Sequence, residues 1–455
     1  MKAILDPQFK PMIVEMRRFA KDIEGNSQRI SLSVVRNADY CETIQMDVFA
    51  EGVNDERNIS FVERIVKSML WMYGGYKVVI SGSPSIYRGI KDAYRVGGPR
   101  EFDRAFMSKQ FENQFVVEFV EKIEDAPKTC RNPRAVGRHL NGCRIGFDAG
   151  GSDRKVSAVV DGKVVYSEEV VWFPKISTDW TYQHQGILEA MRTAASKMPR
   201  VDGIGVSTAG TLMDGKVMSA TIFMKIPEDD FEAHVKTIYL DVAREVAGDV
   251  PVEVANDGDV TALAGAMDLG ENSVLGIAMG TSEAGGYVDP NGNITGWLNE
   301  LAFVPVDACK EAMVDEWSGD YGTGSKYFSQ DAVIKLAPAA GIALDEKLSP
   351  AEKLKVVQKL MDQEDPRAVK IYETIGVYFG YAVAYYMQFY EIRHVLVLGR
   401  VTSGAGGVII LERAREVLDT EFPEISQKVN LVIPDEENRR VGQSIAAASL
   451  PEVIA

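Results

Sequence analysis

Cysteine and histidine are scarce in this sequence of 455 residues, and long apolar runs are missing. The four cysteines, Cys41, Cys130, Cys143 and Cys309, show no paired spacing. We therefore expect no disulfide framework and predict reduced thiols in a cytoplasmic protein, with a Cys130–Cys143 disulfide as the minor alternative. No run of about 18 apolar residues is present, so we expect no membrane-spanning segment. The first ten residues lack an apolar core after a basic start and do not resemble a signal peptide.

Basic residues are in the minority outside the first third of the chain. The formal net charge is −16, from 50 basic and 66 acidic residues. Residues 1–141 contain 22 Lys and Arg against 19 Asp and Glu, so the remaining residues contain 28 against 47. The net charges of the two parts are thus +3 and −19. An acidic body of this kind argues against nucleic-acid binding.

Because single cores stop growing at about 250–300 residues, the length predicts two or three domains.

The first 126 residues predict a small appended α/β domain. Apolar and polar side chains alternate over residues 29–36 and 41–49, which indicates an antiparallel hairpin. We expect helices over 61–72 and 85–109, and strands over 76–80 and 115–119. Residues 127–142 carry proline, glycine and three arginines without apolar periodicity, and we predict a linker there. A degenerate partial repeat of the later sequence is an alternative for the first domain.

Strands and helices alternate after the linker. A second hairpin is expected over residues 143–171, with Asp161-Gly162 as its turn. Further strands are expected at 203–207, 252–255, 274–279, 394–398 and 429–433, and helices at 181–198, 230–247, 405–420 and 438–449. Helices are also expected to dominate from about 308 to 390. This alternation, with several buried apolar strands, predicts α/β layers.

Two glycine-bearing turns follow the first strands of this body, and strand ends are where α/β folds bind ligands. The first turn is Gly150-Gly151-Ser152, between Asp148 and Lys155. Paired glycines let backbone N–H groups approach a phosphate, and a carboxylate at the strand end suits a water-mediated Mg²⁺ contact. The second turn, Ser207-Thr208-Ala209-Gly210, has small residues that allow a substrate hydroxyl to come close. A plain tight turn is the alternative at both places.

Two further turns complete the set. Asn256-Asp257 ends a buried strand, and Asp257 is a candidate for accepting a proton from a substrate hydroxyl. Helix capping is the alternative for this pair, although we expect Asp259 to be the capping residue. Gly280-Thr281-Ser282 lies inside a hairpin and has the backbone and hydroxyl donors of a second phosphate site.

The order of these four turns is similar to that of the superfamily of sugar kinases, heat-shock protein 70 and actin. The closest resemblance is to the ROK family of bacterial sugar kinases and repressors, and it covers Cys143 to Ala455. It implies a two-lobed actin-like ATPase (ribonuclease H-like) fold. The first lobe would comprise residues 143–257 and 435–455, and the second 258–434. The predicted domain organisation is therefore an extra N-terminal domain at 1–126, a linker at 127–142 and these two lobes.

The resemblance also implies roles for individual residues. Asp257 would be the general base, and Asp148 would place Mg²⁺ through water. The sugar would be bound by Asn256, Glu300, Ser207, Thr208 and Gly210. The ATP phosphates and adenosine would be bound by Gly150, Gly151, Ser152, Lys155, Gly280, Thr281, Ser282, Gly399 and Arg400.

The sequence departs from the family pattern near the sugar-binding glutamate. Phe303 stands where family members have a histidine, and the stretch from Asp315 to Ser329 has no cysteine where they have a zinc loop. We therefore predict no structural zinc. Residues 1–125 also lack the basic recognition helix of the family's repressors.

These observations predict an ATP-dependent kinase acting on a hydroxyl of a sugar or sugar-like molecule. A non-catalytic nucleotide or sugar sensor is the first alternative, and an ATPase that acts on a protein partner is the second. We expect a small-molecule substrate, no nucleic acid and no membrane, and we leave open whether the protein forms a homodimer.

Overall fold

The computed structural model describes residues 1–131, 136–434 and 436–453. Four residues of the predicted linker, 132–135 with Arg134 among them, lie outside this range, as do 435 and 454–455 of the predicted first lobe. The chain divides into two compact units. The first comprises Met1–Asn132, Ile277–Gly285 and Gly296–Ile433, and the second comprises Pro133–Gly276, Gly286–Thr295 and Pro434–Ala455. The first 126 residues therefore belong to one unit with residues 277–285 and 296–433 of the later chain.

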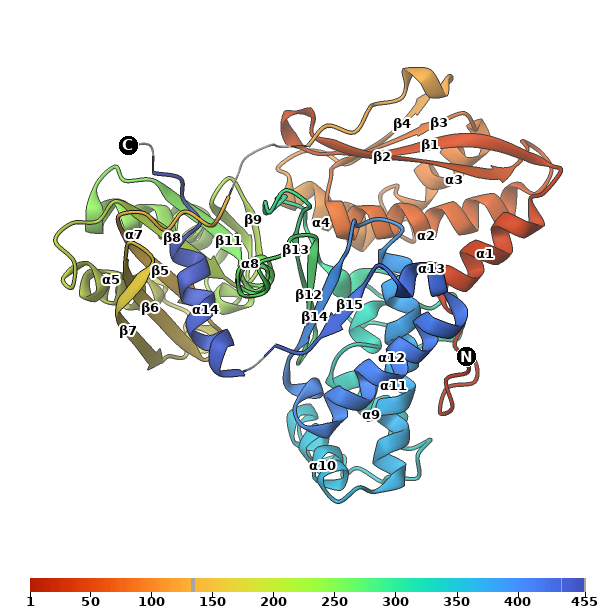
Figure 1. The fold of residues 1–455 in the computed structure, drawn as a ribbon. Helices are drawn as coiled ribbons and strands as arrows, with labels where there is room; N and C mark the ends of the chain where they lie inside the picture. Colours follow the sequence, from red (N-terminus) through yellow and green to blue (C-terminus); the bar gives the residue numbers. More distant parts are fainter. Residues whose placement is uncertain (132–135, 435, 454–455) are drawn as a thin grey trace. The chain divides into compact units, whose positions relative to one another are not determined.

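A four-stranded sheet in the order β2-β1-β3-β4 forms the N-terminal part of the first unit (Figure 1). Its strands are β1 (Ser27–Val35), β2 (Cys41–Phe49), β3 (Lys77–Ser81) and β4 (Val116–Val120), accompanied by the helices α1 (Met12–Asp22), α2 (Asp55–Tyr73), α3 (Pro84–Ala93) and α4 (Glu101–Gln110). The predicted hairpin is confirmed, because β1 and β2 pair antiparallel over their whole length. Apolar residues of α2 such as Val62, Val66 and Leu70 are fully buried.

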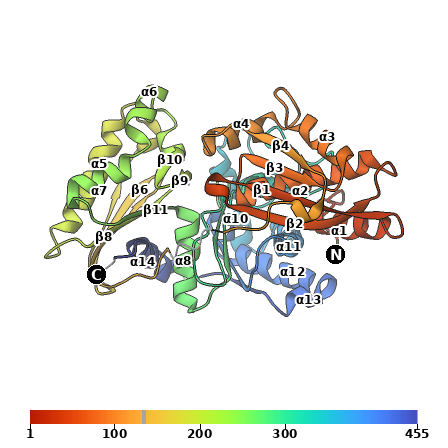
Figure 2. The same ribbon diagram turned by 90° about the horizontal axis from the view of Figure 1, so that it is seen from above.

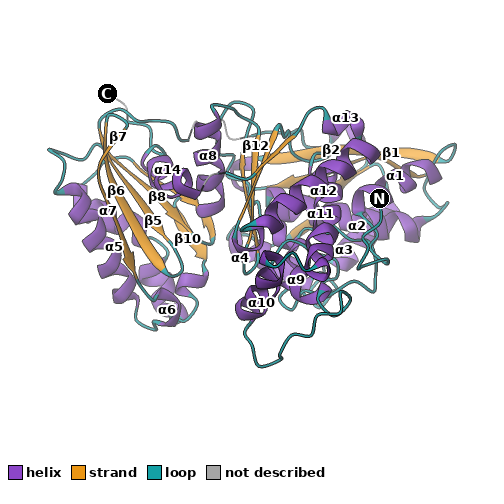
Figure 3. Ribbon diagram, turned by 60° about the horizontal axis from the view of Figure 1, so that its bottom comes forward, coloured by secondary structure: helices purple, strands orange, loops and turns teal. Residues whose placement is uncertain are grey.

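A five-stranded sheet in the order β11-β8-β5-β6-β7 organises the second unit. Its strands are β5 (Cys143–Ala149), β6 (Asp153–Val160), β7 (Lys163–Val171), β8 (Gly203–Thr208) and β11 (Val252–Asn256). Helices α5 (Trp180–Ala195) and α7 (Ile238–Ala247) cover one face, and α14 (Glu436–Ala448) covers the other (Figures 2 and 3). Figure 1 also labels α8 (Asp257–Leu269) and β9 (Thr211–Met213), which pairs with β10 (Lys216–Ser219).

The topologies of these two sheets differ. Strand β8 runs parallel to β5, whereas β3 runs antiparallel to β1. The first domain is therefore not a partial repeat with the same strand directions as the later sheet.

The remaining sheet has the order β13-β12-β14-β15. Its strands are β12 (Val274–Met279), β13 (Glu283–Val288), β14 (His394–Leu398) and β15 (Asn430–Val432). Three α-helices lie between β13 and β14 in the sequence: α9 (Gln330–Leu336), α10 (Pro350–Asp362) and α11 (Pro366–Tyr386). Two lie between β14 and β15: α12 (Ala405–Glu421) and α13 (Pro423–Ser426). The expected helix from about 308 is wrong, because the first regular helix there begins at Gln330. Glycines at 319, 322 and 324 and isolated bridges such as Pro305–Thr323 occupy the stretch before it. No helix within the described ranges is long and apolar enough to cross a membrane.

Candidate active site

The carboxyl ends of β5, β8 and β11 bring several predicted residues to one edge of the five-stranded sheet. In the parallel register Asp148 lies opposite Ser207, and Thr208 lies opposite Asn256. Asp257 is the first residue of α8, directly after Asn256. Because parallel strands end at the same edge, residues that are far apart in the sequence form a continuous polar row.

Asp148 is the most enclosed carboxylate of this row, with 5% of its surface exposed. Ser207 donates its hydroxyl proton to Oδ1 of Asp148 at 2.7 Å, and the Gln443 amide lies 3.4 Å from the same oxygen. Lys155 Nζ lies 3.8 Å from Oδ2. Burial raises the pKa of Asp148, and the Ser207 hydrogen bond opposes this shift.

Asp257 has a carboxyl group whose pKa is raised to about 6. Burial is the main cause, and the nearby negative charge of Asp148 is the second. A carboxylate with this pKa is ionised near neutral pH and still binds a proton more readily than an ordinary aspartate does. These are the properties that a general base needs.

Asn256, predicted to bind the sugar, has its side chain engaged within the protein. Its Oδ1 accepts the backbone N–H of Gly258 at 2.7 Å, which makes it the N-cap of α8, and its Nδ2 donates to the carbonyl of Gly210 at 2.8 Å. The expectation that Asp259 caps this helix is wrong, because its Oδ1 instead accepts the N–H of Tyr287 at 3.0 Å. Asn256 therefore ties the Gly210 turn to the start of the helix that carries Asp257.

Ser207 and Thr208 are fully buried. The hydroxyl of Thr208 lies 2.7 Å from that of Tyr239, in the core beneath the sheet. The hydroxyl of Ser207 thus hydrogen-bonds to Asp148 and that of Thr208 to Tyr239, both within the second unit.

The Gly150–Ser152 turn is held by Trp172, the residue that directly follows β7. The indole N–H of Trp172 donates to the carbonyl of Gly150 at 2.8 Å, and the Trp172 backbone N–H donates to the carbonyl of Ser152 at 3.1 Å. Lys155, predicted to contact a phosphate, is paired with Asp153 at 2.9 Å. The side chain of Lys175 instead lies over Gly151, with Nζ 2.8 Å from where a Cβ would stand.

Lys175 is a residue that the sequence analysis missed. Its side chain is exposed, and it makes no hydrogen bond or ion pair with the residues that the structure describes. It belongs to a single 3₁₀ turn, Pro174–Ile176, with no motif to identify it. Only its folding back onto the glycine turn brings it to the predicted phosphate position.

The other predicted nucleotide residues lie in the first unit, at the ends of β12 and β14. Thr281 and Ser282 are exposed between β12 and β13, and the carbonyl of Gly280 accepts the N–H of Gln330 at 2.9 Å. Gly399 has φ +104°, and a Cβ there would stand 2.4 Å from the carbonyl oxygen of Met279. Glycine at this position therefore lets the two strand ends approach closely. Arg400 follows it with an exposed side chain.

Glu300, predicted to bind the sugar, lies in the first unit, on a segment that hydrogen-bonds to the C-terminal end of α2. Its backbone N–H donates to the carbonyl of Trp71 at 2.9 Å. Phe303 packs on the same tryptophan, with ring centroids 4.2 Å apart. Where the family pattern has a histidine, position 303 thus makes an apolar contact with the N-terminal part of the unit.

Glu283 is a second residue that the sequence analysis passed over. It is buried at the start of β13, where Tyr386 donates to its Oε1 at 3.3 Å. Burial, together with the negative charge of Glu300, raises the pKa of Glu283 to about 8. A carboxyl group of this kind is largely protonated at neutral pH. The available signal was an acidic residue opening an otherwise apolar strand.

Metal ligands are sparse within the described ranges. No group of three or more His, Cys, Asp or Glu is arranged there to hold a metal ion. Asp148 remains the predicted partner of a Mg²⁺ that is otherwise bound by water and phosphate, an arrangement common for this ion.

Solved structures share the fold of this chain, whereas no protein-family model and no curated protein matches its sequence at a significant level. A ROK hexokinase from Thermus thermophilus is 20% identical, with a TM-score of 0.51 over 67% of this chain and 97% of that one. A ROK family transcriptional regulator, a homolog of the E. coli MLC protein, is 18% identical, with a TM-score of 0.53 over 68% of this chain and 79% of that one. The predicted ROK-type, actin-like ATPase fold is confirmed.

Proposed function

We propose that this chain is a member of the ROK family and an ATP-dependent kinase that transfers the γ-phosphoryl group to a hydroxyl of a sugar or sugar-like molecule. The observation that carries this proposal is the carboxylate of Asp257, whose pKa is raised to about 6 at the polar edge of the sheet. The fold shared with a ROK hexokinase supports it.

Asp257 would accept the proton of the substrate hydroxyl as that oxygen attacks the phosphoryl group. The cap that Asn256 forms on α8 fixes the backbone around Asp257, so the point from which its side chain extends is set before substrate arrives. Asp148 raises the proton affinity of Asp257 through its charge. Under this proposal, Glu300 contacts the acceptor. The region that binds the acceptor is also shaped by residues that chiefly hold its backbone in place: Asn256, Ser207, Thr208 and Gly210.

The donors around the glycine turns suit a nucleotide. Lys175 supplies an uncompensated positive charge over Gly151, and Thr281 and Ser282 expose two hydroxyls at the end of β12. Backbone N–H groups and cations of this kind bind phosphates well. We assign Gly150, Gly151, Ser152, Lys155, Gly280, Thr281 and Ser282 to the phosphates, and Gly399 and Arg400 to the adenosine.

Mg²⁺, when bound with the nucleotide, would neutralise charge on the phosphate oxygens. Asp148 would hold its water ligands, because its Oδ2 has only the longer 3.8 Å contact with Lys155. Ser207 fixes the other oxygen and so orients the carboxylate.

A screen of ADP release against a library of sugars tests the proposal. We expect saturable release that depends on one class of sugar and on Mg²⁺. Release that no sugar stimulates would contradict the kinase assignment and would favour an ATPase that acts on a partner.

A sugar-sensing protein without catalysis is the second candidate. Two observations favour it: Phe303 replaces the family histidine, and a ROK transcriptional regulator shares the fold. Sugar binding by calorimetry without sugar-dependent ADP release would identify this function.

A further inference from the structure

The C-terminus of α2 is closed by the segment that carries Glu300. A helix leaves its last carbonyls without partners inside the helix. Here the N–H groups of Leu298, Asn299 and Glu300 donate to the carbonyls of Tyr73, Met72 and Trp71, at 3.4, 2.9 and 2.9 Å respectively. Three successive hydrogen bonds fix the register of Glu300 against a helix of the N-terminal part of the chain.

Aromatic packing fastens the next residues of the segment to the same region. The ring of Phe303 lies 4.2 Å from that of Trp71 and 5.6 Å from that of Phe102 on α4, measured between centroids. Phe106, also on α4, lies 4.8 Å from Trp71. Aromatic pairs at these distances add stabilisation beyond their buried area.

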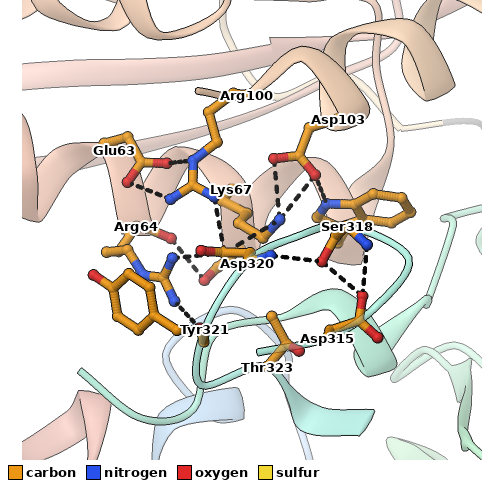
Figure 4. Close-up of polar contacts among 12 residues, drawn as sticks. Glu63, Arg64, Lys67, Arg100, Asp103, Asp315, Ser318, Asp320, Tyr321 and Thr323 are labelled. Atoms are coloured by element: carbon orange, nitrogen blue, oxygen red, sulfur yellow. Dashed lines mark hydrogen bonds and ion pairs between the residues drawn. The ribbon is translucent and has the colours of Figure 1, made fainter. Parts of the chain in front are cut away.

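A buried cluster of charges makes a second attachment to α2 (Figure 4). Asp320 accepts from Arg64 at 2.6 Å and pairs with Arg100 at 2.9 Å and with Lys67 at 3.4 Å. Lys67 also donates to Asp103 at 2.8 Å. Asp320 belongs to the stretch that replaces the family's zinc loop, so charge pairs hold this stretch to α2 and to Arg100, the N-cap residue of α4.

The two attachments are connected through the backbone. The N–H of Val306 donates to the carbonyl of Gly322 at 2.8 Å, and that of Gly324 donates to the carbonyl of Val304 at 2.9 Å. The chain from Glu300 to Gly324 is therefore a loop closed by its own backbone pairing and attached to α2 through Glu300 and Asp320.

We propose that α2 of the N-terminal domain positions Glu300 for the phosphoryl acceptor, and that Phe303 is the side chain through which it does so. This inference rests on the proposed function, because Glu300 is the residue assigned to the acceptor. Phe303 is a positioning residue here, since it acts through the backbone of Glu300. The extra domain thereby becomes part of acceptor binding, and nucleotide binding does not depend on it.

Two matched variants of the full chain test this inference. Phe303→Leu and Phe106→Leu each remove one ring from the same cluster, but only Phe303 lies on the Glu300 segment. We expect Phe303→Leu to raise the acceptor KM about tenfold or more and to leave the ATP KM within about twofold. We expect hydrogen exchange at the amides of residues 298–300 to accelerate in Phe303→Leu only. Thermal unfolding should shift similarly in both variants.

Equal increases in the acceptor KM for the two variants would overturn the inference, because they would reflect general loss of packing. Unchanged exchange at residues 298–300 in Phe303→Leu would overturn it as well. The two proposals fail separately. If the wild-type protein releases no ADP with any sugar, the kinase assignment fails, and the exchange measurement still decides whether Phe303 fixes the Glu300 backbone.

Discussion

At the scale of single residues, the pKa of Asp257 sets the pH at which the proposed reaction can run. The base must be ionised to accept a proton, and its pKa is raised to about 6 by burial and by the charge of Asp148. We therefore predict that kcat/KM rises tenfold per pH unit below about pH 6 and levels off above it. Stopped assays of ADP release between pH 4.5 and 8 measure this profile. A profile that is flat through pH 6 would exclude Asp257 as the base.

Lys175 gives a second test at this scale. It is an exposed cation over Gly151, so its contact with a phosphate resembles a solvent-exposed ion pair, worth up to about 1 kcal/mol. We predict that Lys175→Ala binds ATP about two- to fivefold more weakly and binds adenosine unchanged. Lys163→Ala, which changes an exposed lysine at the start of β7, is the control. Equal weakening in both variants would show a general charge effect.

At the scale of elements, the contact between α14 and the five-stranded sheet depends on glycine. A Cβ at Gly205 of β8 would stand 1.7 Å from the carbonyl oxygen of Ala447 in α14. We predict that Gly205→Ala destabilises the protein by about 1–3 kcal/mol or more, because the helix must move away. Gly276→Ala is the control, since its Cβ would meet only ordinary contacts from 3.4 Å. Thermal unfolding measures both, and equal Tm values would contradict the prediction.

Elements with a clear local pattern could be predicted from the sequence. The hairpin of β6 and β7 follows from its turn, Asp161-Gly162, whose φ angles of +47° and +78° suit a two-residue connection. The structure of the stretch from 308 to 329 could not be predicted, because it is held by charge pairs with distant residues. Arg64 and Asp320, for example, are 256 positions apart in the sequence. Asp257 could be proposed as a site residue from the sequence because it belongs to an Asn-Asp pair that directly follows a buried strand. Lys175 could not be proposed in this way, because only the fold brings its side chain to the glycine turn. Glu283 left a single signal, an acidic residue at the start of an otherwise apolar strand, and its burial comes from distant elements such as α11.

At the scale of the whole molecule, the N-terminal domain and residues 277–285 and 296–433 form one compact unit held partly by buried charges. Burial opposes ionisation of Asp320, but Arg64, Lys67 and Arg100 outweigh it and hold the pKa of this carboxyl well below its usual range. Asp320→Asn leaves these cations without their shared partner. We predict a loss of about 3–5 kcal/mol in the free energy of unfolding at pH 7.

The pH dependence of this loss has a definite sign. Because the folded-state pKa of Asp320 is depressed, its contribution is complete above the unfolded-state pKa of about 4 and declines as the pH falls toward the folded-state value. The stability difference between the wild-type protein and Asp320→Asn should therefore shrink below about pH 4. Urea unfolding at pH 7 and at pH 3 measures it, and a difference that does not change with pH would contradict the account.

Asp257 is proposed as the base of a sugar kinase, and a single pair of proteins decides this role. Sugar-dependent ADP release is measured for the wild-type protein and for Asp257→Asn, with ATP affinity measured in parallel. We expect sugar-dependent release to fall by about 10²-fold or more in the variant, while ATP affinity stays within about twofold. Full sugar-dependent release by Asp257→Asn would contradict this role.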